Sequence, residues 1–281
     1  MLKPFLSISV ILLFITAGYS QTINHFNYKV VVTKSAIRAQ KVGLARDYDV
    51  IVNGNLVKTS NTTYNGGKLL SITNTLYDLS TNLRIAIFEN NSYNVDFIDS
   101  ICQPNCELVS TGETKIIKGM LCEKYQPSKP VDVKTGTPYY SYEMQIKATK
   151  YSFWITKEIQ LDKQLNAIIL KGITKFLIAQ FNGTLVQIDY EVTDTKSETP
   201  TDMKLEVKET VKIDETQFIF PWEQKDQYRA VVDDPYFRDI NGSLIATDEG
   251  FARCKRQKKL LAEVTRDPNP KFVIRTIIFS E

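Results

Sequence analysis

Short segments in which apolar and polar residues alternate recur along this chain. The longest runs from residue 203 to 213, where Met203, Leu205 and Val207 occupy alternate positions and charged residues fill most positions between them. Residues 25–34, 83–89, 93–98 and 140–147 show the same period of two. This period is typical of strands with one buried face and one hydrated face, which are found in antiparallel sheets.

Turn-forming residues separate these segments. Asn-Gly pairs stand at positions 53–54, 65–66 and 182–183, and a Thr-Gly-Thr-Pro sequence occupies 135–138. Such residues suit the tight connections between neighbouring antiparallel strands. The sequence therefore predicts a mainly β fold: an antiparallel meander that forms a curved sheet or half-barrel, with a short helix and a loop-rich C-terminal tail.

Helical patterns are scarce. The best one spans Asp248–Val264, where apolar residues lie among charged ones and Asp248 is the expected cap. A weaker one spans Ser35–Leu44. Residues 221–242 lack clean alternation and are predicted to be a loop-rich tail that packs on the sheet or wraps its edge. Residues 272–279 are predicted to be a final strand. The expected organisation is a signal peptide at 1–20, an antiparallel β domain at 21–220, and a tail at 221–281.

The first twenty residues have the pattern of a secretory signal peptide. One positive charge, Lys3, precedes an apolar run from Phe5 to Ile15, and small residues follow before Gln21. That run is shorter than the roughly 20 residues that a membrane-spanning helix needs. The sequence predicts cleavage before Gln21, an extracellular protein, and no transmembrane segment after cleavage.

Export places the cysteines in an oxidising compartment, where an even number favours disulfide bonds. The chain has four: Cys102, Cys106, Cys122 and Cys254. Two disulfides are expected, and the sequence leaves all three pairings open. Cys102 and Cys106 lack the second close pair that a structural zinc site requires, so no metal site is predicted.

Four sequons have the form Asn-x-Ser/Thr without proline, each beside residues typical of turns. Their asparagines, the expected glycosylation sites, are Asn61, Asn90, Asn182 and Asn241.

Composition and motifs argue against most catalytic chemistries. The chain of 281 residues is 43% hydrophobic, 24% charged and has a formal charge of +3, which does not favour nucleic-acid binding. His25 is the single histidine, and no nucleophile-elbow, phosphate-loop or metalloprotease motif is present. The pairs Asp96 with Asp99 and Asp233 with Asp234 are interpreted as exposed carboxylates rather than as a glycosidase pair. The sequence predicts a non-enzymatic protein without a cofactor.

A basic segment lies within the expected C-terminal helix. It comprises Arg253, Lys255, Arg256, Lys258 and Lys259. Three interpretations remain open: a patch that binds polyanions such as sulfated glycans, a recognition sequence for a processing protease that would cut after Arg256, and a solvated helix face.

Aromatic residues gather around one expected hairpin between residues 139 and 154. Tyr140, Tyr142, Phe153 and Trp154 are candidates to line a pocket for a hydrophobic ligand. Ordinary core packing is the alternative for most of them.

The order of elements resembles that of the secreted, animal-type relatives of the bacterial lipoprotein carrier LolA and of the similar ependymin-related group. The resemblance lies in residues 76–89, 118–126, 151–172 and 181–190, and covers roughly residues 22–220. It implies an antiparallel sheet curled around an apolar groove that holds lipid. No motif of these families fixes ligand-binding residues, so none is assigned.

Two functions are compatible with this pattern. The first is a secreted glycoprotein that binds a hydrophobic ligand, such as a lipid, in a curved sheet. The alternative is an extracellular matrix or structural protein that acts through surface contacts with a polyanionic glycan or matrix. The volume left open inside the sheet distinguishes them, because a ligand-binding protein needs a cavity of several hundred Å³, on the order of that in known ligand sites.

Overall fold

The computed structural model describes residues 24–32, 44–65, 67–100, 102–129, 132–134, 145–174, 177–194, 200–207, 218–238 and 243–278. Within these ranges most residues lie in strands, as the sequence predicts. The strands are β1 (Asn24–Val32), β2 (Leu44–Asn53), β3 (Leu56–Asn65), β4 (Lys68–Asp78), β5 (Leu83–Ile87), β6 (Ser92–Phe97), β7 (Leu108–Ile117), β8 (Met120–Pro127), β9 (Asp132–Lys134), β10 (Gln145–Leu161), β11 (Gly183–Asp194), β12 (Pro200–Val207), β13 (Arg229–Arg238), β14 (Leu244–Ala246) and β15 (Val273–Ile278). The helices are α2 (Lys163–Thr174), α3 (Asp248–Thr265) and the 3-10 turn η2 (Pro221–Glu223).

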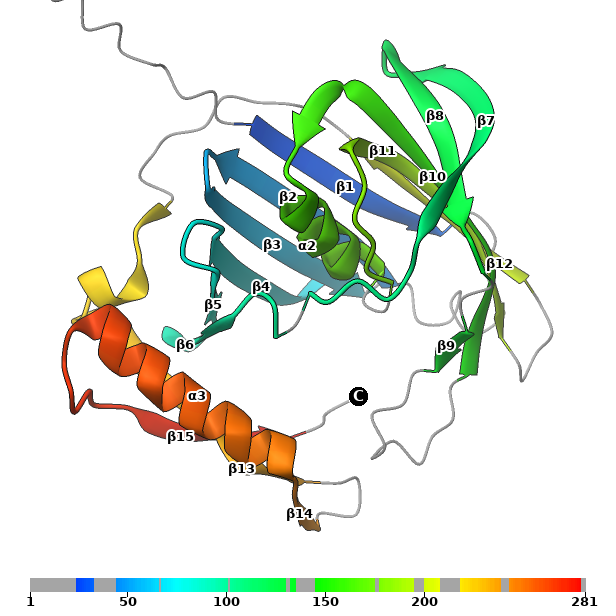
Figure 1. The fold of residues 1–281 in the computed structure, drawn as a ribbon. Coiled ribbons are helices and arrows are strands. Elements are labelled where there is room, and N and C mark those ends of the chain that lie inside the picture. The colour runs from blue at the N-terminus through cyan, green and yellow to red at the C-terminus, as the bar shows by residue number, and fades with distance from the viewer. Residues whose placement is uncertain are drawn as a thin grey trace, which may run out of the picture.

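The strands form one curved sheet that does not close into a barrel (Figure 1). Its order is β14-β13-β6-β5-β4-β3-β2-β1-β12-β11-β10-β8-β7, with β9 beside β10 and β15 beside β13. The pairs from β6 through β7 are antiparallel, whereas β13 pairs in parallel with both β6 and β15. The predicted curved antiparallel sheet is confirmed, and a parallel edge that the sequence did not indicate is added to it.

Helix α2 lies within the curve of the sheet (Figure 1). Its residues 165–170 and Ile173 are all buried. They pack with side chains of β1, β2, β10 and β11 in one hydrophobic group, the α2 cluster, whose largest members include Phe26, Tyr28 and Phe153. A helix buried on nearly every side needs no hydrated face, and this one fills the concave side of the sheet.

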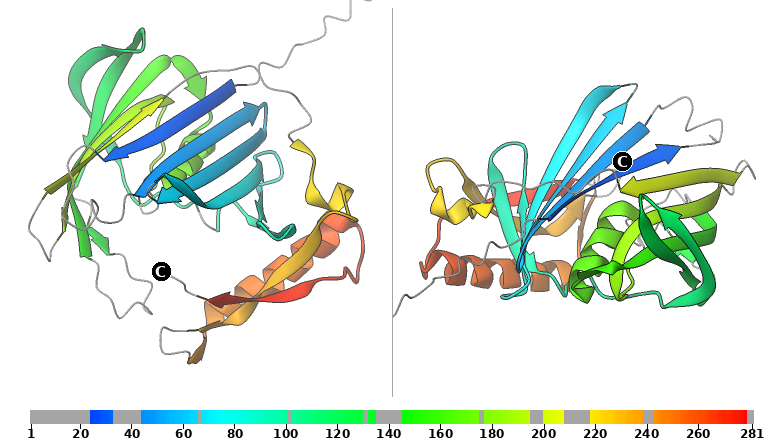
Figure 2. Two further views of the ribbon diagram at one scale, coloured as in Figure 1. Left: turned by 180° about the vertical axis from the view of Figure 1, so that it is seen from behind. Right: turned by 90° about the horizontal axis from the view of Figure 1, so that it is seen from above.

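A second hydrophobic group, the α3 cluster, joins the C-terminal segment to the other face of β2 and β4–β6. Ile51 and Leu76 contribute from the sheet, and Leu260 and Leu261 from α3. Ile51 stands between Val50 and Val52, which belong to the α2 cluster. Residues 50–52 of β2 and 75–77 of β4 are therefore buried on both faces, whereas Leu69, Leu70 and Ile72 of β4 are exposed. Figure 2 shows α3, β13 and β15 at the end of the sheet away from the β7–β8 hairpin.

The C-terminal segment contains the expected helix, α3, and an additional strand, β13. The expected helix agrees closely with α3, although its cap is Thr247, whose side chain accepts a hydrogen bond from the Gly250 N–H at 3.0 Å. The described part of residues 221–242 does pack at the sheet edge, but it contains a strand that the sequence did not indicate, because β13 occupies residues 229–238 and pairs with β6. Its apolar residues 230–232 are buried consecutively, so they show no alternation.

Several sequence predictions fall outside the described residues. These are the signal peptide at 1–20, residues 35–43 of the weaker helix, and most of the 140–147 segment. Leu44 begins β2. In the parts of the chain that the structure describes, the helices are too short or too polar to cross a membrane.

The close approach of α2 to β2 depends on Gly172. A Cβ placed at this position would overlap the ring of Tyr48, which is buried. We expect Gly172→Ala to lower the free energy of unfolding by about 1 to 3 kcal/mol, because overpacking outweighs the better helix propensity of alanine. Urea denaturation measures this change. In a Tyr48→Leu background the same substitution should cost less, whereas a stabilised Gly172→Ala single variant would contradict the close approach.

Candidate functional site

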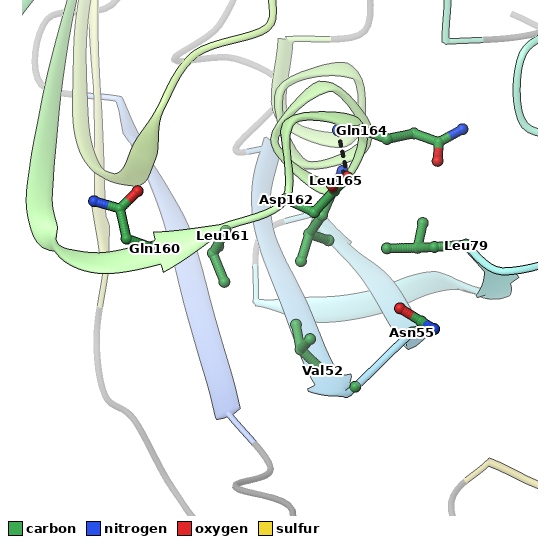
Figure 3. A pocket seen from close by; sticks show the side chains of 9 residues that line it. Val52, Asn55, Leu79, Gln160, Leu161, Asp162, Gln164 and Leu165 are labelled. Carbon is green, nitrogen blue, oxygen red and sulfur yellow. Dashed lines mark hydrogen bonds between the residues drawn. The ribbon is translucent and has the colours of Figure 1, made fainter.

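A pocket of about 350 Å³ lies where the β2–β3 turn faces the start of α2 (Figure 3). Its size falls within the range of small-molecule sites. The residues that line it are Val52, Gly54, Asn55, Leu79, Gln160, Leu161, Asp162, Gln164 and Leu165. The pocket is thus built at one end of the α2 cluster rather than in the middle of the sheet.

One wall comes from the hairpin turn between β2 and β3. Gly54 adopts a φ of 58°, and Asn55 follows it as the second residue of a two-residue turn. A glycine at the first position suits this turn because it tolerates positive φ. The Leu79 N–H donates to the Asn55 carbonyl at 2.9 Å and so fixes the chain after β4 against the turn.

The opposite wall comes from the junction of β10 and α2. Asp162 Oδ1 accepts hydrogen bonds from the N–H groups of Gln164 at 2.7 Å and Leu165 at 3.3 Å. Asp162 is therefore the cap of α2 and satisfies two N–H groups of its first turn. The Gln164 side chain turns away and donates from Nε2 to Asn82 and Asp99, each at 3.3 Å.

Polar groups form the larger part of the pocket surface, and four aliphatic side chains form the rest. Figure 3 shows Leu161, Leu165, Val52 and Leu79 converging on the space, with Asn55 at its margin. Among the lining residues Asp162 alone is ionisable. Within the described residues no three His, Cys, Asp or Glu side chains come together as metal ligands. The arrangement can hold the apolar part of a ligand and offer hydrogen-bonding groups at the rim.

The aromatic residues predicted to line a pocket do not line this one. Phe153 is fully buried in the α2 cluster and stacks on Tyr151 with ring centroids 5.8 Å apart. Trp154 is also buried, donates from Nε1 to Asp189 at 3.0 Å, and lies under the Lys115 ammonium. Tyr140 and Tyr142 lie outside the described residues. Core packing explains Phe153 and Trp154, since both belong to the α2 cluster and β10 lies between β11 and β8.

The four cysteines are free thiols in the structure, so the expected two disulfides are not formed in it. Cys102 and Cys122 are buried in the α2 cluster, and Cys106 packs against it. Cys254 belongs to the α3 cluster and has no other cysteine beside it there. Burial raises the pKa of the Cys102, Cys106 and Cys122 thiols, which lowers their reactivity.

The sequons occupy different environments. Asn90 and Asn182 are exposed, in the β5–β6 turn and just before β11, as expected for glycosylation sites. Asn61 instead lies within β3, paired with Tyr48 and Thr73, and its Oδ1 is buried. The expectation of a turn at Asn61 is therefore wrong, because β3 continues to Asn65. Asn241 lies outside the described residues.

The basic segment is divided by α3 into two groups. Arg256 donates from Nε and Nη2 to the Asp96 carboxylate at 2.5 and 3.0 Å, and these bonds raise the pKa of the guanidinium. Arg253 lies 3.7 Å from Asp233. Lys255, Lys258 and Lys259 are exposed. A five-residue polyanion patch is therefore not presented, and the bond after Arg256 lies within a helix.

Asp96 and Asp233 are buried, which corrects the expectation that they are exposed. Asp233 is 5% exposed and accepts hydrogen bonds from Arg275 at 2.5 and 2.8 Å and from Gln257 at 3.0 Å. Its backbone N–H donates to Gln257, and Asn94 of β6 lies 3.3 Å from both of its carboxylate oxygens. Buried carboxylates need such compensation, and here three arginines supply it. The network fastens α3 and β15 to β6 and β13.

Sequence reasoning missed the pocket because its walls are far apart in the chain. The one local signal is Asp162, an aspartate directly before the first helical residue, Lys163, which is the N-cap position. The signal is weak because residues 165–170, with Asn166 as the one polar residue, do not show the spacing of a helix with one hydrated face.

Comparisons with known proteins do not assign a family. No family model matches the chain, and no curated protein matches it. One solved structure with similarity to it is described as "Structure of PNGF-II in C2 space group". The match has 11% identity and a TM-score of 0.39, and covers 74% of this chain but 30% of that one. A similarity of this size carries no argument about function. The resemblance to LolA and ependymin-related proteins stays a prediction.

The Asp233 network predicts a stability effect. We expect Asp233→Asn to lower the free energy of unfolding by roughly 3 kcal/mol, because it leaves the arginines around that side chain without their counter-ion. Urea denaturation measures the loss, and amide exchange should rise more in α3 than in α2. Asp234→Asn is the matched control, since Asp234 is less buried and contacts the Tyr236 N–H. Its change should stay within about 0.5 kcal/mol. If the two substitutions lowered the free energy of unfolding equally, the hydrogen bonds and ion pairs of Asp233 would make no special contribution to stability.

Proposed function

We propose that this chain is a secreted, glycosylated, non-enzymatic protein that binds a hydrophobic ligand, and that the apolar part of the ligand lies in the pocket between the β2–β3 turn and α2. The observation that carries this proposal is the convergence of four aliphatic side chains on one hollow of about 350 Å³. The sequence also predicts a hydrophobic ligand, but it predicts a binding site inside the curve of the sheet rather than at the β2–β3 turn. The pocket lies beside α2, because the side chains of α2 occupy the concave side of the sheet.

A binding role fits the chemistry of the pocket better than catalysis does. Asp162 has one carboxylate oxygen engaged by the N–H groups of α2, and the other polar side chains that line the pocket are carboxamides. His25 is not among the lining residues and contacts Asp49 at 3.0 Å. General acid–base catalysis requires a titratable group that is free to transfer a proton.

The pocket proposal is tested by closing the hollow from its rim. Asn55→Trp places a large ring over the opening from an exposed turn position. We expect the affinity for the neutral fluorescent probe N-phenyl-1-naphthylamine to fall at least tenfold, as measured by fluorescence titration. Asn269→Trp makes the same change at an exposed position outside the lining, and should leave binding unchanged. Unchanged binding in Asn55→Trp, or no binding by the unmodified protein, would rule the pocket out.

A second candidate function, polyanion binding at the protein surface, is favoured by the exposure of three lysines on α3. Lys255, Lys258 and Lys259 remain accessible, although Lys259 lies 3.6 Å from Glu263 and Lys258 lies over the Phe272 ring. Their charges can attract a sulfated glycan, and the attraction is screened by salt.

Heparin chromatography tests this second function. Replacing Lys255, Lys258 and Lys259 together by Gln should lower the salt concentration needed for elution, if α3 is the contact surface. The triple replacement of Lys68, Lys118 and Lys163, which are also exposed, removes the same charge elsewhere and is the control. If both triple variants elute alike, α3 has no special role.

A further inference from the structure

We infer that the pocket selects amphipathic ligands with a neutral or cationic polar group, such as a long-chain alcohol, and discriminates against anionic amphiphiles such as ionised fatty acids. This inference rests on the proposed function and narrows its ligand class. The inference follows from the charged and polar groups that surround the pocket.

The pocket rim is acidic. Asp162 lines it, and none of the described lining residues is Lys, Arg or His. Asp99 lies close by, since its Oδ1 accepts a hydrogen bond from the Gln164 side chain at 3.3 Å. Asp78 directly precedes the lining residue Leu79 and caps the turn after β4 by accepting from the Ser80 N–H at 2.9 Å. A carboxylate head group placed at the rim would meet like charges. Asp162 and Asp99 are exposed, so this repulsion is partly screened by water and salt.

The start of α2 does not offset this repulsion. A helix N-terminus attracts anions when its first N–H groups are free. Here Asp162 Oδ1 occupies those of Gln164 and Leu165, and the Asp162 carbonyl accepts from the Asn166 N–H at 3.0 Å. The one cation in the first turn, Lys163, is exposed and does not line the pocket. The carboxylate of the protein therefore already occupies the position that a ligand carboxylate would take.

The remaining polar groups suit a neutral head group. Asn55 presents a carboxamide at the rim, which can both donate and accept hydrogen bonds. Gln160 also lines the pocket, but its Nε2 already donates to the Lys157 carbonyl at 2.8 Å. The second oxygen of Asp162 accepts hydrogen bonds only, so it favours a ligand hydroxyl or ammonium that donates. An alcohol can donate to such an acceptor, whereas an ionised acid can only accept.

The experiment compares decanol with decanoate at pH 7.5, each displacing N-phenyl-1-naphthylamine from the full mature protein. Because the two compounds differ in solubility, the decisive measurement is the change that each shows on Asp162→Asn. Asparagine keeps the helix cap and removes the charge. We expect decanoate to bind about threefold to tenfold more tightly to the variant. Decanol should not gain affinity, because its hydroxyl loses the carboxylate oxygen as an acceptor. Asp226→Asn, at an exposed position outside the lining, is the control and should alter neither.

The outcomes separate the two proposals. If decanoate binds Asp162→Asn no better than the unmodified protein while the probe still binds, the charge inference is overturned and the pocket stands. If Asp226→Asn has the same effect as Asp162→Asn, the repulsion comes from overall charge and the inference is again overturned. If neither decanol nor the probe binds the unmodified protein, the proposed function itself fails, and this inference fails with it.

Discussion

The packing of α2 against the concave face of the sheet is the interaction on which the rest of the structure depends. The helix is short, and seven of its twelve residues are buried, so its stability comes from the sheet rather than from its own sequence. In turn, the sheet has aromatic and aliphatic side chains on its concave face that need a cover. Gly172 permits the close approach, and Asp162 fixes where the helix begins. The pocket lies in the space that α2 leaves between its first turn and the β2–β3 turn.

The sequence predicts strands well where one face meets water and poorly where both faces are covered. Residues 25–32 and 83–87 alternate and are strands, and α3 keeps a hydrated side and begins at the expected residue. In contrast, α2 and β13 are covered on most sides, so their apolar residues run together and hide the helical or strand period. Parallel pairing of β13 with β6 joins segments more than a hundred residues apart, and no local pattern indicates it.

The same reason explains the errors about charged residues. The alternation of Asp96 with apolar neighbours predicts an exposed carboxylate, yet β6 lies under α3 and both of its faces are buried. Its partner Arg256 is 160 positions away in the sequence and belongs to the basic segment that was considered as one polyanion patch. Only the tertiary arrangement shows that two of those five basic residues neutralise buried carboxylates. The rim of the pocket is equally non-local, because it combines a turn, a helix cap and the chain after β4.

The pairing of β13 with β6 also sets the order in which the protein can be completed during synthesis. Strand β6 is finished within the first hundred residues, but the strand that covers its edge emerges more than 130 residues later. Until then its backbone N–H and C=O groups form an open edge that could join the edge of another nascent chain. The ion pair between Asp96 and Arg256 likewise forms only after α3 has been made, so the C-terminal segment completes both the edge and the charge balance of β6.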